Sequence, residues 1–388
     1  MTQLDLSKRY LLARPIGGFN DMLVQLERAA EYAKRFDRVM ILDTRFSGLQ
    51  AQLETVFEWH DPDGPEVIMY TQEIGDQLNR IPSVFPPVLR HNILSYEVKW
   101  NRQAGTAMEM HSGQVLTFDM VRDYREGLLV HHQAGGGVIA YRTLKRLRLK
   151  TDVANEIVSR LLPLGVDYDA IHIRHSDYQT RYWQLLLLLR LVLRNRHVLI
   201  CSDNAQVKRL ARRILHRSTK LISVSDIPDL AGKPLHGTKQ NDPLQLNLNM
   251  LTDLFSMALS RRLFFTGVAP QKHNQTFKSG LRLWYQSYSG FSVLAERLRS
   301  NPEVVVSLLQ NNTMREPAEL LRERRTESSD PVRQKQIQRQ DKVLGILHKG
   351  IRDPKWLYLD SPLPDNVLSP HRLKGLYAQS AEDAASEG

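Results

Sequence analysis

The chain has 388 residues and a formal net charge of +11, with 53 Lys and Arg against 42 Asp and Glu. Its length exceeds one ordinary core and fits two domains, and a hydrophobic fraction of 42% excludes a largely disordered chain. A single cysteine, Cys201, excludes an intrachain disulfide, and no window has the about 18 uninterrupted apolar residues of a membrane span. Residues 1–30 also lack a basic stretch followed by an apolar run, so we expect a cytoplasmic protein. The positive charge favours polyanions or phosphorylated ligands without choosing among them.

The first part of the chain alternates in the manner of a βαβ unit. Apolar residues spaced three and four apart predict a helix from Met22 to Phe36, and Asn20 is the expected N-cap. A loop with Gly17-Gly18-Phe19 precedes this helix, and a second glycine cluster stands at 135–137. Short apolar runs predict the strands, which are residues 10–13, 39–42 and 128–132. We expect one α/β domain here, over residues 1–140.

The second part of the chain repeats strand and helix with clear periods. Apolar runs predict strands at 170–173, 197–201, 221–224 and 263–265. Spacings of three and four residues predict helices at 182–193, 205–215 and 243–259. Thr151 is expected to cap an earlier helix, and another helix begins near Phe291. Such alternation is typical of a parallel sheet with helices on both faces, so we expect a Rossmann-like domain over residues 141–310.

The remaining residues, 311–388, are predicted to form a charged helical tail. Residues 332–351 combine apolar positions with many Lys, Arg and Gln, as in a basic amphipathic helix. Such a helix would bring the protein to an anionic membrane surface or to a partner, and a helix packed on the second domain is the equal alternative. Residues 379–388 are predicted to be disordered.

The segment that points most clearly to a ligand is Ile171-His172-Ile173-Arg174-His175-Ser176-Asp177, where an apolar strand ends in polar residues. Ligands of open α/β sheets bind beyond the carboxyl ends of the strands, and strand alternation sends His172 and Arg174 to one face. A guanidinium offers a planar fork that suits a diphosphate. The alternative is a structural ion pair between Arg174 and Asp177.

Three further segments carry candidate ligand residues. Gly17 and Gly18 open a helix, where free amides favour an anion, although a tight turn accounts for them as well. Ser202 and Asp203 follow a strand, but such residues are also common helix N-caps. Asp253 stands on a mainly apolar helix, where a carboxylate needs a partner or solvent. A guanine base would offer this carboxylate two N–H donors, whereas the alternative is an exposed polar face.

Other chemistries have less support in the sequence. The histidines and the cysteine lack the spacing of a zinc site, and His131 and His132 are predicted to face opposite ways on a strand. No GxSxG nucleophile elbow is present, and the basic segments lack the interleaved aromatic residues that stack on bases. We therefore expect no metal site and no nucleic-acid partner.

Taken together and in this order, the Gly-Gly-Phe-Asn helix start, the His-x-Arg-x-x-Asp strand end, the Ser-Asp-Asn strand end and the Asp-bearing helix resemble the GDP-fucose fucosyltransferase superfamily. The resemblance covers about residues 10–298 and includes Pro15 to Gln25, followed by Glu27, Ala29 and Ala33. It implies a GT-B-like fold, with two Rossmann-like domains facing each other across a donor-binding cleft. It also implies an inverting, metal-independent transfer of a sugar, with fucose expected, from a GDP-sugar to a saccharide acceptor, with no cofactor beyond this donor substrate.

The resemblance further implies roles for the motif residues. Arg174 would bind the β-phosphate of GDP and act in catalysis, with Asn20 as the second catalytic residue. The donor-binding residues would be Gly17, Gly18, Phe19, His172, Arg174, His175, Asp177, Ser202, Asp203 and Asp253. Among these, His172 and Asp253 would hold the guanine. The resemblance does not identify the general base. Asp21 and Asp177 are candidates only because they adjoin the motifs, and the alternative for each is a helix cap or an ion pair.

Two departures from the family pattern bear on the donor. Residues 266–270 read Thr-Gly-Val-Ala-Pro where relatives often have a Thr or Ser cluster, and His175 replaces a second arginine. A histidine would bind a diphosphate less firmly than an arginine.

The expected acceptor is a glycan or lipid-linked saccharide of a bacterial cell envelope, or a secreted polysaccharide. The alternatives are a transferase of the same fold with another nucleotide-sugar donor, and a noncatalytic polyanion- or membrane-binding protein with a transferase-derived fold.

Overall fold

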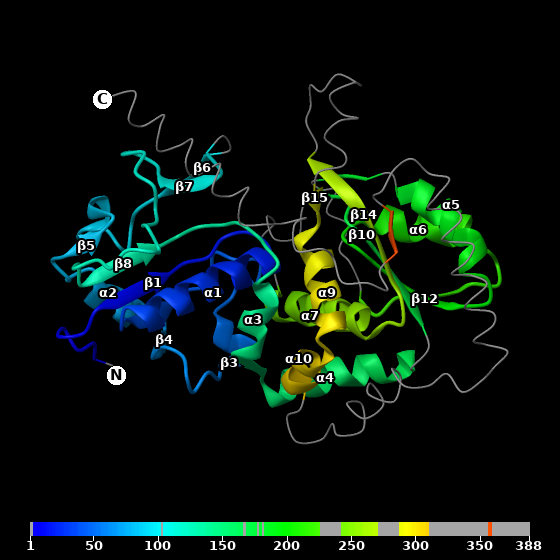
Figure 1. The fold of residues 1–388 in the computed structure, drawn as a ribbon, viewed down its shortest axis with the longest axis horizontal. Coiled ribbons are helices and arrows are strands. Elements are labelled where there is room, and N and C mark those ends of the chain that lie inside the picture. The colour runs from blue at the N-terminus through cyan, green and yellow to red at the C-terminus, as the bar shows by residue number, and fades with distance from the viewer. Residues whose placement is uncertain are drawn as a thin grey trace. The chain divides into compact units, whose positions relative to one another are not determined.

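The computed structural model describes residues 3–101, 104–165, 168–176, 178–180, 182–225, 242–270, 287–309 and 356–358. Within them the chain divides into two compact units, unit 1 up to Arg148 and unit 2 from Leu149 onward. Each unit is built on its own largely parallel sheet (Figure 1). The α/β class and the parallel sheets predicted from the sequence are confirmed. Apart from strand β16 (Trp356–Tyr358), the predicted tail lies outside the described residues.

The sheet of unit 1 has five parallel strands in the order β4-β2-β1-β8-β5. Their bounds are β1 (Tyr10–Ala13), β2 (Val39–Leu42), β4 (Val67–Met69), β5 (Val84–Phe85) and β8 (Leu128–His131). Strands β1, β2 and β8 are buried along their whole length. This burial on both faces explains why their sequences are apolar without alternation.

Helices cover both faces of this sheet. Helix α1 (Phe19–Arg35) contacts β1 and β2, and helix α2 (Gln72–Leu78) packs on the other face, where Tyr10 and Leu12 meet Ile74. The N-cap of α1 is Gly18, so the prediction of Asn20 as the N-cap is wrong. The cap forms earlier because the carboxylate of Asp21 accepts a hydrogen bond from the amide of Gly18 at 3.3 Å.

Shorter elements complete unit 1. They are η1 (Leu53–Thr55), β3 (Phe57–Trp59), η2 (Pro87–Leu89), β6 (Val98–Asn101), β7 (Thr106–Glu109), α3 (Ala140–Lys145) and β9 (Leu147–Leu149). Strands β6 and β7 form an antiparallel hairpin, and β3 pairs with β9.

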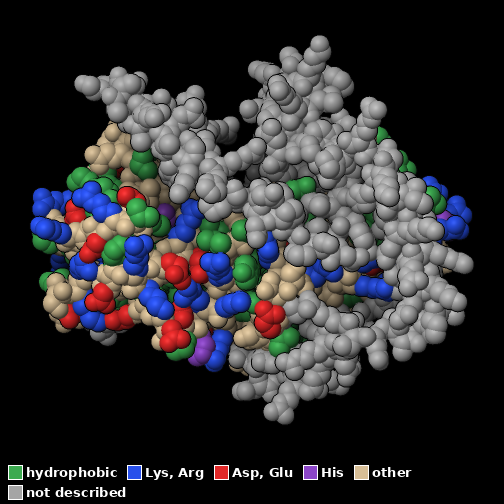
Figure 2. All heavy atoms as spheres, in the orientation of Figure 1, with side chains coloured by type: hydrophobic (Ala, Val, Ile, Leu, Met, Phe, Trp, Pro, Cys, Tyr) green, Lys and Arg blue, Asp and Glu red, His purple; other side chains and the backbone are tan. Residues whose placement is uncertain are grey.

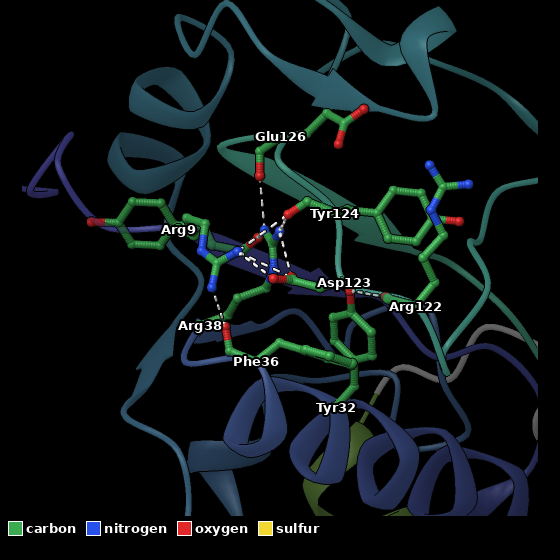
Figure 3. A network of polar contacts seen from close by, with 9 residues as sticks. Arg9, Tyr32, Phe36, Arg38, Arg122, Asp123, Tyr124 and Glu126 are labelled. Carbon is green, nitrogen blue, oxygen red and sulfur yellow. Dashed lines mark hydrogen bonds and ion pairs between the residues drawn. The ribbon is translucent and has the colours of Figure 1, made fainter.

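A buried arginine fixes the amino ends of the strands in unit 1 (Figure 3). Arg38, which precedes β2, donates hydrogen bonds to the carbonyl oxygens of Tyr124 and Glu126, which precede β8. Arg9 reinforces the cluster through an ion pair with Asp123 at 3.0 Å. These contacts bind β2 to β8 at the edge of the sheet opposite to the carboxyl ends.

The sheet of unit 2 follows the order β11-β14-β10-β12-β13, in which β14, β10, β12 and β13 are parallel. The bounds of its strands are β10 (Asp169–Ile173), β11 (Tyr178–Gln179), β12 (His197–Ser202), β13 (Lys220–Ile222), β14 (Leu263–Pro270) and β15 (Ser287–Tyr288). Strands β11, β15 and β16 run antiparallel to β14. The helices are α4 (Thr151–Leu161), η3 (Leu162–Leu164), α5 (Tyr182–Val192), α6 (Ala205–Ile214), α7 (Pro243–Leu259), α9 (Gly290–Ser300) and α10 (Pro302–Leu309).

The helices of unit 2 divide between the two faces of its sheet. Ile171 and Ile173 of β10 pack with the apolar side chains of α5 and α6. His172, which alternates with them, faces α9 through a contact with Ser292, and α7 contacts β10 and β12. Helix α4 has Lys150 as its N-cap, so the expected cap at Thr151 is wrong and that residue is the first of the helix.

A buried ion cluster fixes the amino ends of the strands in unit 2. Asp169 at the start of β10 binds Arg262, which precedes β14, at 2.7 Å, and Arg196, which precedes β12, at 3.0 Å. Burial alone would raise the pKa of Asp169, but the two guanidinium groups hold it below its usual value. These ion pairs thus connect the three strands at their amino ends and do not involve their carboxyl ends.

Candidate functional site

The turn after β10 is organised by Asp203, the residue that follows β12. Its Oδ1 accepts a hydrogen bond from the amide of His175 at 2.7 Å, and its Oδ2 accepts one from the hydroxyl of Ser176. Nε of Arg174 lies 3.8 Å from the same Oδ2, and 19% of the arginine side chain is exposed. Arg174 is therefore placed at the carboxyl edge of the sheet beside Asp203. The alternative ion pair with Asp177 lies outside the described residues.

The Ser-Asp-Asn segment has a structural part as well. Asn204 is the N-cap of α6 and accepts a hydrogen bond from the amide of Gln206 at 2.8 Å. Its side-chain amide donates to the carbonyl oxygen of His175 at 2.9 Å, and Ser202 accepts from the amide of Asn204 at 3.2 Å. The segment thus caps one helix and fastens the neighbouring turn, which preorganises Arg174.

Two histidines lie at this edge, and burial keeps both neutral. Burial lowers the pKa of His172 to about 4, and its Nδ1 is 2.6 Å from the hydroxyl of Ser292. Burial also lowers the pKa of His175, whose Nδ1 is 3.1 Å from the hydroxyl of Thr180. At neutral pH the positive charge of this turn is therefore carried by Arg174.

Asp253 on α7 is a buried carboxylate whose Oδ1 accepts no hydrogen bond from the described residues. Asp253 as a whole residue is half-buried, but its Oδ1 atom is shielded from solvent. Oδ2 accepts from the hydroxyl of Ser225, after β13, at 2.8 Å. Burial raises the pKa of Asp253 to about 6, against the attraction of Lys208. An ionised carboxylate with a free buried oxygen is costly without a donor.

The position of Asp253 relates it to the β10 turn. Its carboxyl group interacts with the thiol of Cys201 on β12, and Cys201 is paired in register with His172 on β10. Unit 2 thus brings His172, Arg174, His175, Asp203 and Asp253 to the carboxyl ends of neighbouring strands and the helix beside them.

In unit 1 the glycine loop before α1 is constrained by its surroundings. Gly17 has a φ of +95°, and a Cβ there would lie 2.8 Å from Oδ2 of Asp21. Phe19 is buried and stacks on Phe57 with ring centroids 6.2 Å apart. The side chain of Phe19 therefore has a structural part in the packing of unit 1.

Asn20 connects this loop to the second glycine cluster. Its side-chain amide donates to the carbonyl oxygen of Gly137 at 3.2 Å and its Oδ1 accepts from the amide of Gly137 at 3.3 Å. Gln25 of α1 likewise donates to the carbonyl oxygen of Gly135. A Cβ on Gly136 would lie 2.4 Å from Asp21 and 2.8 Å from Asn20. The two glycine segments thus form one structure, and a catalytic role of Asn20 stays a prediction beside this structural one.

Sequence reasoning missed a second group of polar side chains at the carboxyl edge of the unit 1 sheet. Arg14 follows β1 and His132 follows β8, and both line a pocket of about 660 Å³. Their signal in the sequence is the one that identified Arg174, a polar residue directly after an apolar strand. His131, by contrast, points to the other face, where its Nε2 is 2.9 Å from Oε1 of Gln25, so the predicted divergence of the two histidines is confirmed.

Charge on the visible surface is mixed. Figure 2 shows Lys and Arg side chains interspersed with Asp and Glu over the described part of one face of the molecule. Within the described residues, no group of three or more His, Cys, Asp or Glu could hold a metal ion. The helices that the structure describes include none that is long and apolar enough to cross a membrane.

Comparison with known proteins gives a likeness of structure. No family model matches the chain, and no curated protein matches it. It is similar to the solved NodZ α-1,6-fucosyltransferase soaked with GDP-fucose, at 17% identity over 75% of this chain and 92% of that chain, with a TM-score of 0.46. NodZ from Bradyrhizobium is 17% identical over 66% and 96% of the two chains, with a TM-score of 0.43. POFUT1 in complex with GDP is 12% identical over 76% and 96%, with a TM-score of 0.40.

Proposed function

We propose that this chain is a glycosyltransferase that uses a GDP-sugar, with fucose as the expected sugar, and transfers it to a saccharide acceptor. The observation that carries the proposal is the buried Oδ1 of Asp253, which has no hydrogen-bond partner among the described residues. It stands one strand away from the turn that holds Arg174, and the sequence motifs that contain both residues resemble those of the GDP-fucose fucosyltransferases.

Asp253 accounts for the choice of base. The ring and amino N–H groups of guanine form a pair of donors on one edge, which matches a carboxylate. Adenine lacks this pair, so it would leave the buried carboxylate unsatisfied. His172, whose ring lies against Phe291 with centroids 5.5 Å apart, would lie beside the base.

Arg174 accounts for the diphosphate. Charge develops on the β-phosphate as the sugar departs, and a preorganised guanidinium stabilises this charge without a metal. The contacts of Asp203 with the turn fix its backbone before any substrate arrives. Because His175 is neutral, Arg174 supplies the cationic charge of this turn, so its loss should be felt mainly in the rate of transfer.

The finer parts of the proposal concern reaction and acceptor. Inverting transfer needs a general base for the acceptor hydroxyl, and Asp21 and Asp177 are the candidates from their place beside the motifs. Asp21 also accepts from the amide of Gly18 and so has a structural part. The acceptor is proposed to be a glycan or a lipid-linked saccharide, and the cytoplasmic location and the membrane contact of the tail stay predictions.

Thermal unfolding in the presence of EDTA tests the nucleotide part. GDP at a hundred times its dissociation constant should stabilise the protein by about 2.7 kcal/mol, which is a shift of a few degrees for a chain of this size. UDP, CDP and ADP should shift the melting temperature much less. Asp253→Asn should remove this preference, whereas Asp152→Asn, an exposed carboxylate of the same unit, should keep it. Equal shifts by all four nucleotides, or a strict need for magnesium, would contradict the proposal.

A further inference from the structure

The carboxyl edge of the unit 1 sheet has a pocket whose lining residues are not among those of the nucleotide site described above. The pocket has a volume of about 660 Å³ and lies where the strands end. Arg14 follows β1, Tyr70 follows β4 and His132 follows β8, and each continues the alternation of the strand face that packs on α2. The segment from Ile93 to Trp100 supplies a further part of the wall. The position is the usual one for a ligand in an open α/β sheet.

Two arginines give the pocket a net positive charge. Asp43, which is fully buried, holds both of them: its Oδ2 is 3.0 Å from Nε of Arg14, and its Oδ1 is 2.8 Å from Nε of Arg45. Arg14 also donates from Nη1 to the carbonyl oxygen of Ile93 at 2.9 Å. No carboxylate is among the described residues that line the pocket. One carboxylate therefore faces two guanidinium groups, which leaves one positive charge for a ligand to neutralise.

A buried histidine adds an unused donor. The hydroxyl of Tyr96 accepts from Nη1 of Arg14 at 3.2 Å, so its own hydrogen is directed to Nδ1 of His132 at 2.6 Å. Burial, with the nearby charge of Arg14, lowers the pKa of His132 to about 3, so the ring is neutral. The shared hydrogen bond then leaves the ring hydrogen on Nε2. This Nε2 is buried and has no hydrogen-bond partner among the described residues.

Aromatic rings form the walls and the mouth of the pocket. The guanidinium of Arg14 lies 5.0 Å from the ring centroid of Tyr70, and that of Arg45 lies 4.7 Å from the same centroid. Phe46 and Trp100 line the pocket while 48% and 43% exposed, respectively. Flat apolar rings beside a few fixed polar groups are typical of small-ligand sites, and the apolar C–H face of a pyranose stacks on such rings.

We propose that this pocket binds a sugar ring that carries a carboxylate, such as a uronic acid residue, with the carboxylate at Arg45 and Arg14 and the ring against Trp100 and Phe46. The two arginines account for the negative charge of the ligand. The role of such a saccharide as the acceptor rests on the proposed function. Arg45 already binds Asp43 through Nε at 2.8 Å and Nη2 at 2.9 Å, so its Nη1 is the group that meets the carboxylate of the ligand. A charge-assisted hydrogen bond is stronger than a neutral one, so a neutral sugar of the same shape binds less tightly.

The test compares cellobiouronic acid with cellobiose, which differ in one carboxylate. Binding of each disaccharide to the full chain, without nucleotide and in EDTA, is measured by calorimetry and by saturation-transfer NMR. The acidic disaccharide is expected to bind saturably and at least tenfold more tightly than cellobiose. Arg45→Gln should remove this tenfold preference, whereas Arg125→Gln, which loses the same charge at an exposed position of the same unit, should keep it. Trp100→Ala should weaken the binding of the acidic disaccharide and reduce saturation transfer to the protons of its sugar rings.

Three results would overturn the inference. They are equal affinity for the two disaccharides, the same loss in Arg125→Gln as in Arg45→Gln, and unchanged binding in Trp100→Ala. Circular dichroism and the melting temperature of each variant show that the fold is kept. The GDP melting experiment on the same preparation separates this inference from the proposed function. GDP binding without acidic-sugar binding refutes the pocket alone, and acidic-sugar binding without GDP binding refutes the transferase alone.

Discussion

Replacing Asp253 by Asn should stabilise the protein without nucleotide while it removes the preference for GDP. Burial raises the pKa of Asp253 from its usual 3.8 to about 6, so the folded state holds this proton more firmly than the unfolded state does. Each pKa unit corresponds to about 1.4 kcal/mol. The ionised carboxylate therefore lowers the free energy of unfolding by about 3 kcal/mol above pH 6, and this loss is regained as the pH falls from about 6 to about 3.8.

The magnitude for Asp253→Asn is reduced by the contact that the substitution alters. The hydroxyl of Ser225 donates to the carboxylate at 2.8 Å, and a hydrogen bond to a charged group is worth about 1.5–3 kcal/mol. An asparagine oxygen can still accept this bond, so we expect a net gain of about 1–3 kcal/mol at pH 8 and a smaller gain at pH 5. Calorimetric unfolding at the two pH values measures it, in the transition that GDP shifts. A variant that is less stable at pH 8, or equally changed at both pH values, would show that the carboxylate is a satisfied structural group.

Substitutions of Arg174, Asp169 and Gly136 test other parts of the structure. Arg174→Ala should lower the rate of sugar transfer by about a hundredfold or more, equivalent to about 3 kcal/mol of lost stabilisation of the leaving diphosphate. Arg174→Lys should recover little of this rate because an ammonium group lacks the planar fork of a guanidinium. Activity of Arg174→Ala within threefold of the parent, with unchanged circular dichroism, would refute the role of Arg174. Asp169→Asn should lower the free energy of unfolding by about 3–5 kcal/mol because two buried guanidinium groups lose their partner. Since the folded pKa of Asp169 is below its usual value, this difference should be present at neutral pH and disappear as the pH falls through that lowered pKa; a pH-independent difference in denaturant unfolding would contradict it. Gly136→Ala should lower the free energy of unfolding by about 1–3 kcal/mol through overpacking. Gly137→Ala is the control because its Cβ would meet nothing closer than Val24 at 3.7 Å, so this variant should melt near the parent temperature. Equal melting temperatures of the two variants would refute the crowding at Gly136.

Local patterns predicted the regular elements well. The bounds that the apolar periods indicate are those of the structure for the strands at 10–13 and 39–42 and for the helix at 243–259. Such elements can be predicted because the buried face of a strand or helix consists of apolar residues at regular spacings in the sequence. Caps were harder to predict. Asn20 and Thr151 have the composition of N-caps, but the turns form earlier, at Gly18 and Lys150.

Roles that depend on distant partners could not be read from the sequence. Asn20 is bound to Gly137, more than a hundred positions along the chain. The polar residues Gln25 and Glu27, which belong to the motif that carries the family resemblance, are buried in contacts with Gly135 and Arg146. Part of that motif therefore preserves a structure in unit 1, and the resemblance alone does not separate this part from residues that contact a substrate.

The same limit applies to the pocket in unit 1. Arg14, Asp43 and His132 come from three strands that are neighbours only in the folded sheet. His131 and His132 are predicted to face opposite ways on their strand, and their hydrogen-bond partners confirm this. Their separate partners on the two faces follow only from the packing of α1 and of the segment around Tyr96.

A crystal structure of the protein grown with GDP in EDTA tests the central claim most directly. The account predicts the guanine edge at Oδ1 of Asp253, with His172 beside the base and the β-phosphate bound by Arg174. A nucleotide bound elsewhere, or a guanine that makes no contact with Asp253, would contradict it.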